Sequence, residues 1–205
     1  MTVDIRQVFG ESPQVMTEIL QDGVNLAVWQ RRLPAQVEDF ANLVLSLGQP
    51  LADERVIEVD ERQPPALPGL LRETADLHGY DGFVADVAWL VAAYTCLLGA
   101  RRLGVRLRVL EGAMCPRMHV DHVPLRLLST YAGAGSEWLP EGAIDRTRLQ
   151  LAPPPVDNVR RLVAGEVALL KGEKWLGNEG AGLVHRSPQT PAWERRLLLS
   201  LDWLA

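Results

Sequence analysis

The segment Gly104-Val-Arg-Leu-Arg-Val-Leu110 decides the fold class, because its hydrophobic period differs from that of the chain before it. Its residues alternate: Val105, Leu107 and Val109 form one set, and Arg106, Arg108 and Leu110 form the other. Successive side chains of a strand point to opposite faces of a sheet. The segment therefore predicts a half-buried strand whose apolar face covers a core.

Further strand-like runs follow this segment, at residues 117–121, 125–131, 166–171, 182–185 and 196–203. The turns between them are rich in glycine or proline, as in Ala132-Gly-Ala-Gly-Ser136 and Ala152-Pro-Pro-Pro-Val156. Many short strands separated by such turns are typical of a sandwich or barrel. The second half of the chain is therefore predicted to form a β core.

The first hundred residues have mainly helical patterns. Apolar residues at helical spacing predict helices over 34–47 and 69–78, and residues 83–98 are apolar nearly all round, as in a buried helix packed on a sheet. Between the first two, Arg55–Asp60 has the character of a short strand. We predict an α+β protein in which residues 1–205 form a single domain, with 1–100 as helical support and 101–205 as the β core.

The composition is that of an ordinary globular protein, with 47% hydrophobic and 23% charged residues in 205. The longest apolar run, Val87–Ala100, is shorter than the roughly 18 residues of a membrane span, so no membrane association is expected. The N-terminus has neither a signal-peptide nor a transit pattern, and Cys96 and Cys115 form no C-x-x-C pair. These features predict a cytoplasmic location.

The charge distribution is uneven. A net charge of −5 argues against a nucleic-acid-binding protein. Residues 1–100 contain 6 basic and 15 acidic residues, whereas residues 101–205 contain 15 basic and 11 acidic residues. A small anion is therefore expected to bind in the second half, if the protein binds one.

Three residues of the β half have the character of metal ligands. His119 and Asp121 are two positions apart, so on a strand both side chains point to one face. His185, at the end of the apolar run Gly182-Leu-Val184, supplies a third ligand. Two histidines and one carboxylate form the set that binds non-haem Fe(II) and leaves three positions open.

Residues 117–203 resemble the core of the Fe(II)/2-oxoglutarate-dependent dioxygenases. The matching motifs are His119-Val-Asp121, Gly165-Glu-Val-Ala-Leu-Leu-Lys-Gly172, His185-Arg-Ser-Pro188 and Arg195-Arg-Leu-Leu-Leu-Ser-Leu-Asp-Trp203. The whole chain also resembles a bacterial family of unknown function. The resemblance implies a double-stranded β-helix (a cupin-like or jelly-roll-like core), Fe(II) bound by His119, Asp121 and His185, 2-oxoglutarate as small-molecule cosubstrate, and an oxidised substrate whose identity it leaves open.

The resemblance also implies an arginine that binds the 5-carboxylate of 2-oxoglutarate. A guanidinium group matches a carboxylate with two parallel hydrogen bonds. Arg195 and Arg196 follow the distal histidine by 10 and 11 positions and point to opposite faces of their strand. Arg196 is favoured because its face continues through Leu198 and Ser200, Arg195 is the alternative, and Arg126 is a further candidate anion contact.

Two alternatives remain open. Cys115, His119, Asp121 and His122 contain the ligand types of a Zn²⁺ site, which would suit a cupin-like zinc-handling protein without oxygenase activity. The second is a metal-free interaction module that uses the acidic helical half. The chain has no G-x-S-x-G, P-loop or G-x-G-x-x-G motif, so serine hydrolases, P-loop nucleotide hydrolases and dinucleotide-dependent enzymes are not indicated.

Overall fold

The computed structural model describes residues 4–60, 63–149 and 156–204. It confirms an α+β protein. In chain order the elements are β1 (Arg6–Gly10), η1 (Pro13–Leu20), β2 (Val24–Trp29), α1 (Ala35–Ser46), β3 (Ala52–Glu58), η2 (Arg72–Thr74), α2 (Tyr80–Leu98), β4 (Arg102–Glu111), β5 (Leu125–Ala132), β6 (Glu137–Trp138), η3 (Arg146–Arg148), η4 (Val156–Asn158), β7 (Arg160–Arg161), β8 (Val167–Lys171), β9 (His185–Arg186) and β10 (Arg195–Trp203).

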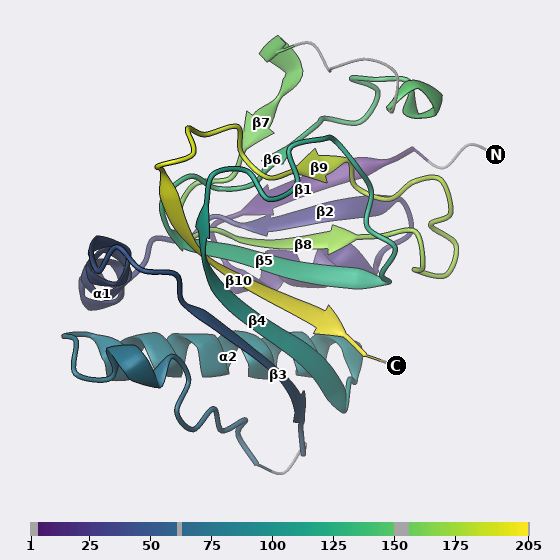
Figure 1. Ribbon diagram of the computed structural model, residues 1–205. Coiled ribbons are helices and arrows are strands. Elements are labelled where there is room, and N and C mark those ends of the chain that lie inside the picture. Colours follow the sequence, from purple (N-terminus) through teal and green to yellow (C-terminus); the bar gives the residue numbers. More distant parts are fainter. Residues whose placement is uncertain (1–3, 61–62, 150–155, 205) are drawn as a thin grey trace.

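Seven strands form one large sheet in the order β1-β2-β8-β5-β10-β4-β3 (Figure 1). All neighbouring strands are antiparallel except β1 and β2, which run parallel. A small sheet has the order β7-β6-β9, and each of its strands is two residues long. Strands this short cannot join the edges β1 and β3, so in the described residues the β structure is not a closed barrel.

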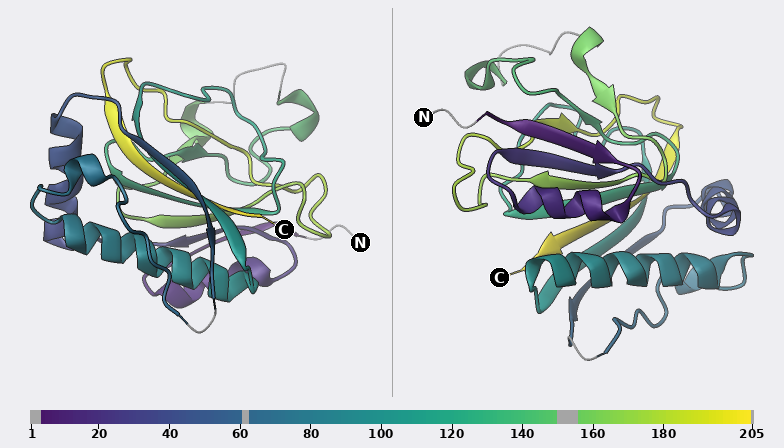
Figure 2. Two further views of the ribbon diagram at one scale, coloured as in Figure 1. Left: turned by 60° about the horizontal axis from the view of Figure 1, so that its bottom comes forward. Right: turned by 180° about the vertical axis from the view of Figure 1, so that it is seen from behind.

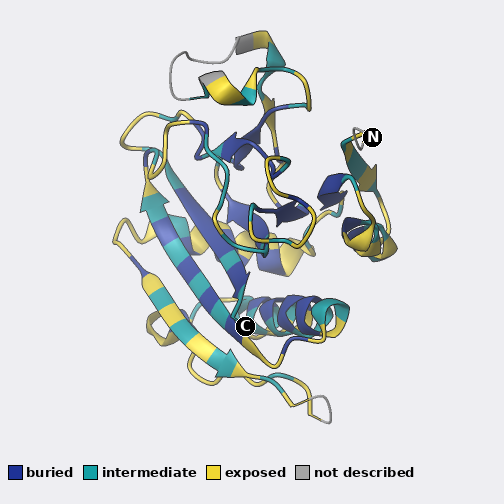
Figure 3. Ribbon diagram, turned by 90° about the vertical axis from the view of Figure 1, so that its right-hand side faces the viewer, coloured by how far each residue is buried: buried dark blue, intermediate teal, exposed yellow. Residues whose placement is uncertain are grey.

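The two faces of the large sheet have different roles. The apolar residues of β4 and β10 point to one face, where they pack with α1 and α2: Leu103, Val105, Leu107, Val109, Leu197, Leu199 and Leu201. The segments that carry the small sheet lie over the other face (Figure 2). The predicted alternation in residues 104–110 is therefore confirmed, and Figure 3 shows it as alternating burial along the strands.

The two longest predicted helices are present. In α1 the buried residues Val37, Phe40, Ala41 and Val44 share one side, as their spacing predicts. Helix α2 packs on α1 and on the sheet through Phe83, whose ring centroid lies 4.7 Å from that of Phe40 and 4.8 Å from that of Tyr131. These contacts join the helices to the central strand β5.

Helix α2 is longer than the apolar run predicted from the sequence. With 19 residues and a mean hydropathy of 1.5, it is the one helix of the described chain that is long and apolar enough to cross a membrane. Phe83, Val87, Leu90, Val91 and Tyr94 are buried on its sheet-facing side. One side of the helix thus packs on the sheet, whereas Trp89 is 45% exposed, so the helix is not buried all round as its composition predicted.

The predicted helix over 69–78 is wrong, because only the short η2 forms there. Pro68 precedes the segment, and Gly69 and Leu71 have positive φ angles of 66° and 44°. The unusual conformation of Leu71 is held by its N–H, which donates to Oδ2 of Asp53 at 3.0 Å. A helix cannot continue through these residues.

The first hundred residues also contribute three strands, whereas the sequence indicated one. Strand β3 overlaps the predicted segment Arg55–Asp60 but begins at Ala52 and ends at Glu58, and β1 and β2 were not predicted. The first five residues of β2 are all buried, because the strand lies between β1 and β8 with side chains covered on both faces. A strand buried on both faces shows no alternation of apolar and polar residues, so the sequence pattern did not indicate a strand there.

Candidate metal centre

Three donor groups converge above the large sheet. Ligand atoms of His119, Asp121 and His185 all lie within 4.8 Å of one another. Nε2 of His119 is 3.6 Å from Oδ1 of Asp121, and Nε2 of His185 is 3.3 Å from Oδ2. The residues predicted as metal ligands are therefore brought together by the fold.

A backbone bridge holds the two histidines beside each other. The N–H of His119 donates to the carbonyl of His185 at 3.0 Å, and the N–H of His185 donates back at 3.0 Å. Residues 117–121 do not form the regular strand that was predicted, since this bridge is their only ladder pairing. Pro116 and Pro124 flank the segment and lack the N–H groups that a longer ladder needs.

Each histidine is oriented by its own backbone environment. Nδ1 of His119 lies 2.9 Å from the carbonyl oxygen of Arg117, and Nδ1 of His185 lies 3.2 Å from that of Leu183. A carbonyl oxygen only accepts hydrogen bonds, so these contacts assign the proton to Nδ1. Nε2 of each ring then faces Asp121: it donates to the carboxylate when the imidazole is protonated, and it offers its lone pair to a metal when the imidazole is neutral.

The carboxylate of Asp121 is held in its ionised form. Burial alone would raise its pKa, but hydrogen bonds from His119 and His185 and the charge of Arg126 outweigh that effect and hold the pKa far below its usual range. In turn, the hydrogen bond to Asp121 raises the pKa of His119. The cluster thus concentrates negative charge on Asp121, where a cation would bind.

The donor set suits a divalent transition metal. Two imidazole nitrogens and one carboxylate oxygen are the ligands of non-haem Fe(II) sites, and three protein ligands leave positions open for other molecules. The fixed Nδ1 protons add the support that such ligands need. Among the described residues, neither Cys115 nor His122 joins this cluster, so the four-residue zinc set considered from the sequence is not assembled.

Arg196 and Arg195 have different surroundings. Arg196 is 4% exposed and lines a cavity that also contains His119 and His185. Arg195 points away, with its guanidinium group on Glu111 at 2.6–2.7 Å. Of the two arginines, Arg196 lines the cavity beside the histidines, and Arg195 is not among the described lining residues.

Arg196 is a buried cation without a carboxylate partner in the described chain. Its Nη1 donates to Oγ of Ser136 at 3.2 Å and its Nη2 to Oγ of Ser187 at 3.1 Å, while Nε has no partner. Burial lowers the pKa of Arg196 to about 10. A buried charge is costly unless it is paired, so this guanidinium group has donor capacity that an anionic partner could use.

A glycine allows the strand that carries Arg196 to pass close to β5. Gly133 follows β5 with a φ of 84°, and a Cβ at this position would lie 2.3 Å from the carbonyl oxygen of Arg195 and 2.8 Å from Cα of Arg196. A side chain there would displace the start of β10. The glycine-rich exit of β5 thus positions Arg196.

Arg126 contacts the candidate metal ligand Asp121, so its whole guanidinium group is not free to bind an anion. Its Nη1 donates to Oδ2 of Asp121 at 2.7 Å, and its Nε donates to Oδ1 of Asp202 at 2.7 Å. The guanidinium group thus bridges two carboxylates. Its place is beside the metal ligands, as an orienting group for Asp121.

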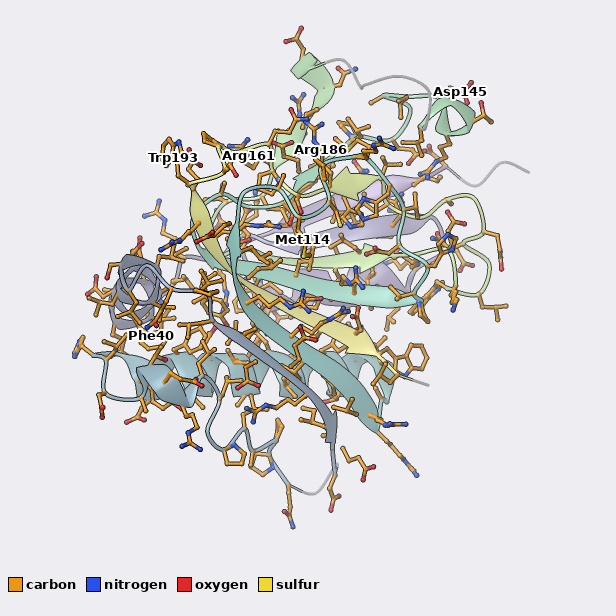
Figure 4. All side chains as sticks on the ribbon, in the orientation of Figure 1. Phe40, Met114, Asp145, Arg161, Arg186 and Trp193 are labelled. Carbon is orange, nitrogen blue, oxygen red and sulfur yellow. The ribbon has the colours of Figure 1, made fainter. Side chains whose placement is uncertain are left out.

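The cavity between the large sheet and its covering segments has a volume of about 100 Å³. Met114 and Arg186, which both line it, lie on this side of the sheet in Figure 4. Sequence reasoning did not assign Ser136, Ser187, Arg106, Arg108 or Arg186 to the site. One feature of the sequence pointed to Arg106 and Arg108. The alternation in residues 104–110 placed both arginines on the face of the sheet opposite the core.

Together, fold and site define an α+β protein with a mostly antiparallel sheet and a His-Asp-His cluster at one face. A family model described as "Protein of unknown function (DUF1826)" matches residues 10–202. The chain belongs to this family. No curated protein matches the sequence.

Solved structures resemble the whole chain at low sequence identity. A dioxygenase for auxin oxidation from rice has a TM-score of 0.50 and 14% identity, with 98% of this chain and 83% of that chain covered. A bsmA homolog from Methylobium petroleophilum PM1 has a TM-score of 0.50 and 13% identity, with coverage of 100% and 97%. A Pseudomonas putida prolyl-4-hydroxylase has a TM-score of 0.48 and 14% identity, with coverage of 93% and 96%. The first two likenesses show a shared fold.

Proposed function

We propose that this protein is an Fe(II)- and 2-oxoglutarate-dependent oxygenase built on a double-stranded β-helix. The observation that carries the proposal is the buried Arg196, whose partners among the described residues are the hydroxyls of Ser136 and Ser187 and which shares one cavity with His119 and His185. An anion site beside a candidate metal site suits a cosubstrate that binds a metal at one end and an arginine at the other. The fold shared with the rice dioxygenase supports this proposal.

In this proposal the metal is held by Nε2 of His119, Nε2 of His185 and the carboxylate of Asp121. Bound Fe(II) would supply the activation of O₂ that couples decarboxylation of 2-oxoglutarate to oxidation of the substrate. The protein keeps both imidazoles in the ligating tautomer through the carbonyls of Arg117 and Leu183. Arg126 holds the carboxylate of Asp121 in orientation through its Nη1 and adds to the effect of the two histidines, which favour the ionised form.

At the other end of the cavity, Arg196 would bind the far carboxylate of 2-oxoglutarate. A dicarboxylate offers the buried guanidinium group the opposite charge that it lacks. Ser136 and Ser187 fix the orientation of this group through their hydroxyls. Leu128 and Leu198, which line the cavity nearby, exclude water and so strengthen the ionic contact.

Anaerobic calorimetry tests the proposal, with Mn(II) added first and 2-oxoglutarate second. We expect 2-oxoglutarate to bind only after the metal. Arg196→Gln should weaken 2-oxoglutarate binding at least tenfold and leave metal affinity unchanged. Arg195→Gln is the matched control, because it alters the neighbouring arginine that points out of the cavity.

Three outcomes would contradict the proposal. Tight Zn²⁺ binding without any response to 2-oxoglutarate would indicate a metal-handling protein. Equal 2-oxoglutarate affinity in Arg196→Gln and Arg195→Gln would remove the assigned role of Arg196. Absence of metal binding would leave the metal-free interaction module.

A further inference from the structure

A second set of cations lies in the same cavity, on strand β4. Arg106 and Arg108 are two positions apart on one strand, so both side chains lie on the same face of the sheet. That face lines the cavity, where both residues join Arg196. In the register of β4 and β10, Arg106 lies opposite Ser200 and Arg108 opposite Leu198, so the two arginines flank the row that leads from Arg196. We call Arg106 and Arg108 the β4 arginine pair.

The lining of this cavity is strongly basic. It includes the arginines Arg106, Arg108, Arg126, Arg186 and Arg196, and none of its described lining residues is an aspartate or glutamate. The carboxylates that contact these arginines, such as Asp202 and Glu54, are not among the lining residues. Four of these five arginines also pair with carboxylates behind the lining, which are Asp202, Glu54, Asp121 and Glu137, so a ligand meets guanidinium donor groups whose charge is partly balanced.

The β4 arginine pair is only partly satisfied by its carboxylates. Arg108 pairs with Glu54 through Nη2, whereas its Nη1 contacts the sulfur of Met114 at 3.7 Å. A thioether is a weak acceptor, so this amine group keeps its capacity to donate. Arg106 pairs through Nη2 with Asp202, a carboxylate that it shares with Arg126. Each side chain of the pair thus has donors left for a ligand.

Stability alone does not account for two arginines at these positions. Their side chains are 40% and 34% exposed, and ion pairs with this exposure contribute little to folding. Two like charges on one strand face repel each other, and β-branched residues would suit the strand better. Binding of 2-oxoglutarate does not require the pair either, because Arg196 already supplies the cation that would bind the far carboxylate of 2-oxoglutarate.

We propose that the β4 arginine pair binds an anionic group, a carboxylate or a phosphate, of a small-molecule primary substrate. This inference rests on the proposed oxygenase function and adds the chemical class of the substrate. Guanidinium groups bind such oxyanions with paired, charge-assisted hydrogen bonds. The pair lies in the same cavity as the histidines of the metal centre, so an anion held there would place the rest of the molecule near the reacting metal.

Calorimetric titration with inorganic phosphate tests the inference. The protein is first loaded anaerobically with Mn(II) and saturating 2-oxoglutarate, so that Arg196 is occupied. We expect wild-type protein to bind phosphate at low ionic strength, and Arg108→Gln and Arg106→Gln each to weaken binding at least fivefold. Arg195→Gln is the control, because Arg195 is also paired with a glutamate but lies outside the cavity.

Two results would overturn the inference: no phosphate binding to the loaded wild-type protein, or equal affinity in the β4 variants and Arg195→Gln. Their circular dichroism spectra and unfolding midpoints confirm that the variants are folded. The same titration on unloaded Arg196→Gln protein separates the two proposals. If Mn(II) and 2-oxoglutarate fail to bind to the wild-type protein but phosphate still binds to unloaded Arg196→Gln protein through the β4 arginine pair, the anion site stands and the oxygenase function fails.

Discussion

Arg126 donates from Nη1 to Oδ2 of Asp121 at 2.7 Å, although Asp121 also faces both histidines of the candidate metal centre. The other side of the same guanidinium group is held by Asp202, near the end of β10. Asp121, a candidate metal ligand, is thus connected to the large sheet through one arginine. Asp121 lies outside any regular strand, so this contact orients it in place of a ladder.

Arg126→Gln is therefore expected to weaken Mn(II) binding about tenfold, because removal of groups that orient metal ligands typically has an effect of this size. Calorimetry measures the affinity. Arg106→Gln is the matched control, since Arg106 also pairs with Asp202 but does not contact Asp121. If both variants bound Mn(II) as wild type does, Arg126 would have no role in positioning Asp121.

His119→Ala is expected to lower Mn(II) affinity at least 100-fold, because the variant loses one of three ligands and leaves Asp121 with a single imidazole partner. His122→Ala should have no effect, since His122 is exposed and stands outside the convergent cluster. The same calorimetric titration compares the two variants. A loss of affinity in His122→Ala equal to that in His119→Ala would contradict the assigned ligand set.

Arg196→Met is expected to stabilise the protein while it abolishes 2-oxoglutarate binding. The substitution removes a buried charge whose Nε has no partner and fills the space with an apolar chain. Such replacements stabilise by about 1 kcal/mol, which corresponds to a rise of about 2–4 °C in unfolding midpoint for a protein of this size. Differential scanning calorimetry without ligands measures the shift. A drop in the midpoint of Arg196→Met would show that Arg196 supports the fold.

Glu137→Gln is expected to destabilise the protein by about 2 kcal/mol at pH 7, because Glu137 accepts charged hydrogen bonds from Arg161 at 2.5 Å and Arg186 at 2.7 Å. Burial would raise the pKa of Glu137, but the two arginines outweigh it and lower the pKa below the ordinary value of 4.5. A carboxyl group with a lowered pKa stabilises the fold above its unfolded pKa, and the contribution disappears as the pH falls through the folded pKa. The difference between wild type and variant should thus be constant above pH 5 and shrink below about pH 4.5.

Urea unfolding between pH 3 and pH 8 measures this difference. Glu58→Gln, at an exposed position on the edge strand β3, is the control and should leave the free energy of unfolding nearly unchanged. A Glu137→Gln effect that does not change with pH would mean that the ionised carboxylate is not what stabilises the small sheet.

Elements with a clear period were predictable from the sequence, because that period depends on neighbouring residues only. The apolar spacing in residues 34–47 and the alternation in 104–110 correspond to α1 and β4. Strands β1 and β2 were missed, since they join the sheet through β8, which lies more than 130 residues later. Pairing between segments so far apart leaves no local pattern.

The same distinction applies to the candidate site. By itself, the sequence determined which residue types stand at His119, Asp121, His185 and Arg196, and the order in which they occur. Only the tertiary structure decided that the three ligands converge, that Arg196 and not Arg195 enters the cavity, and that Arg126 serves Asp121. The physical reason is that spacing along the chain fixes the face of a strand, whereas burial, charge pairing and convergence depend on how segments pack in space, as where the backbone bridge joins His119 to His185.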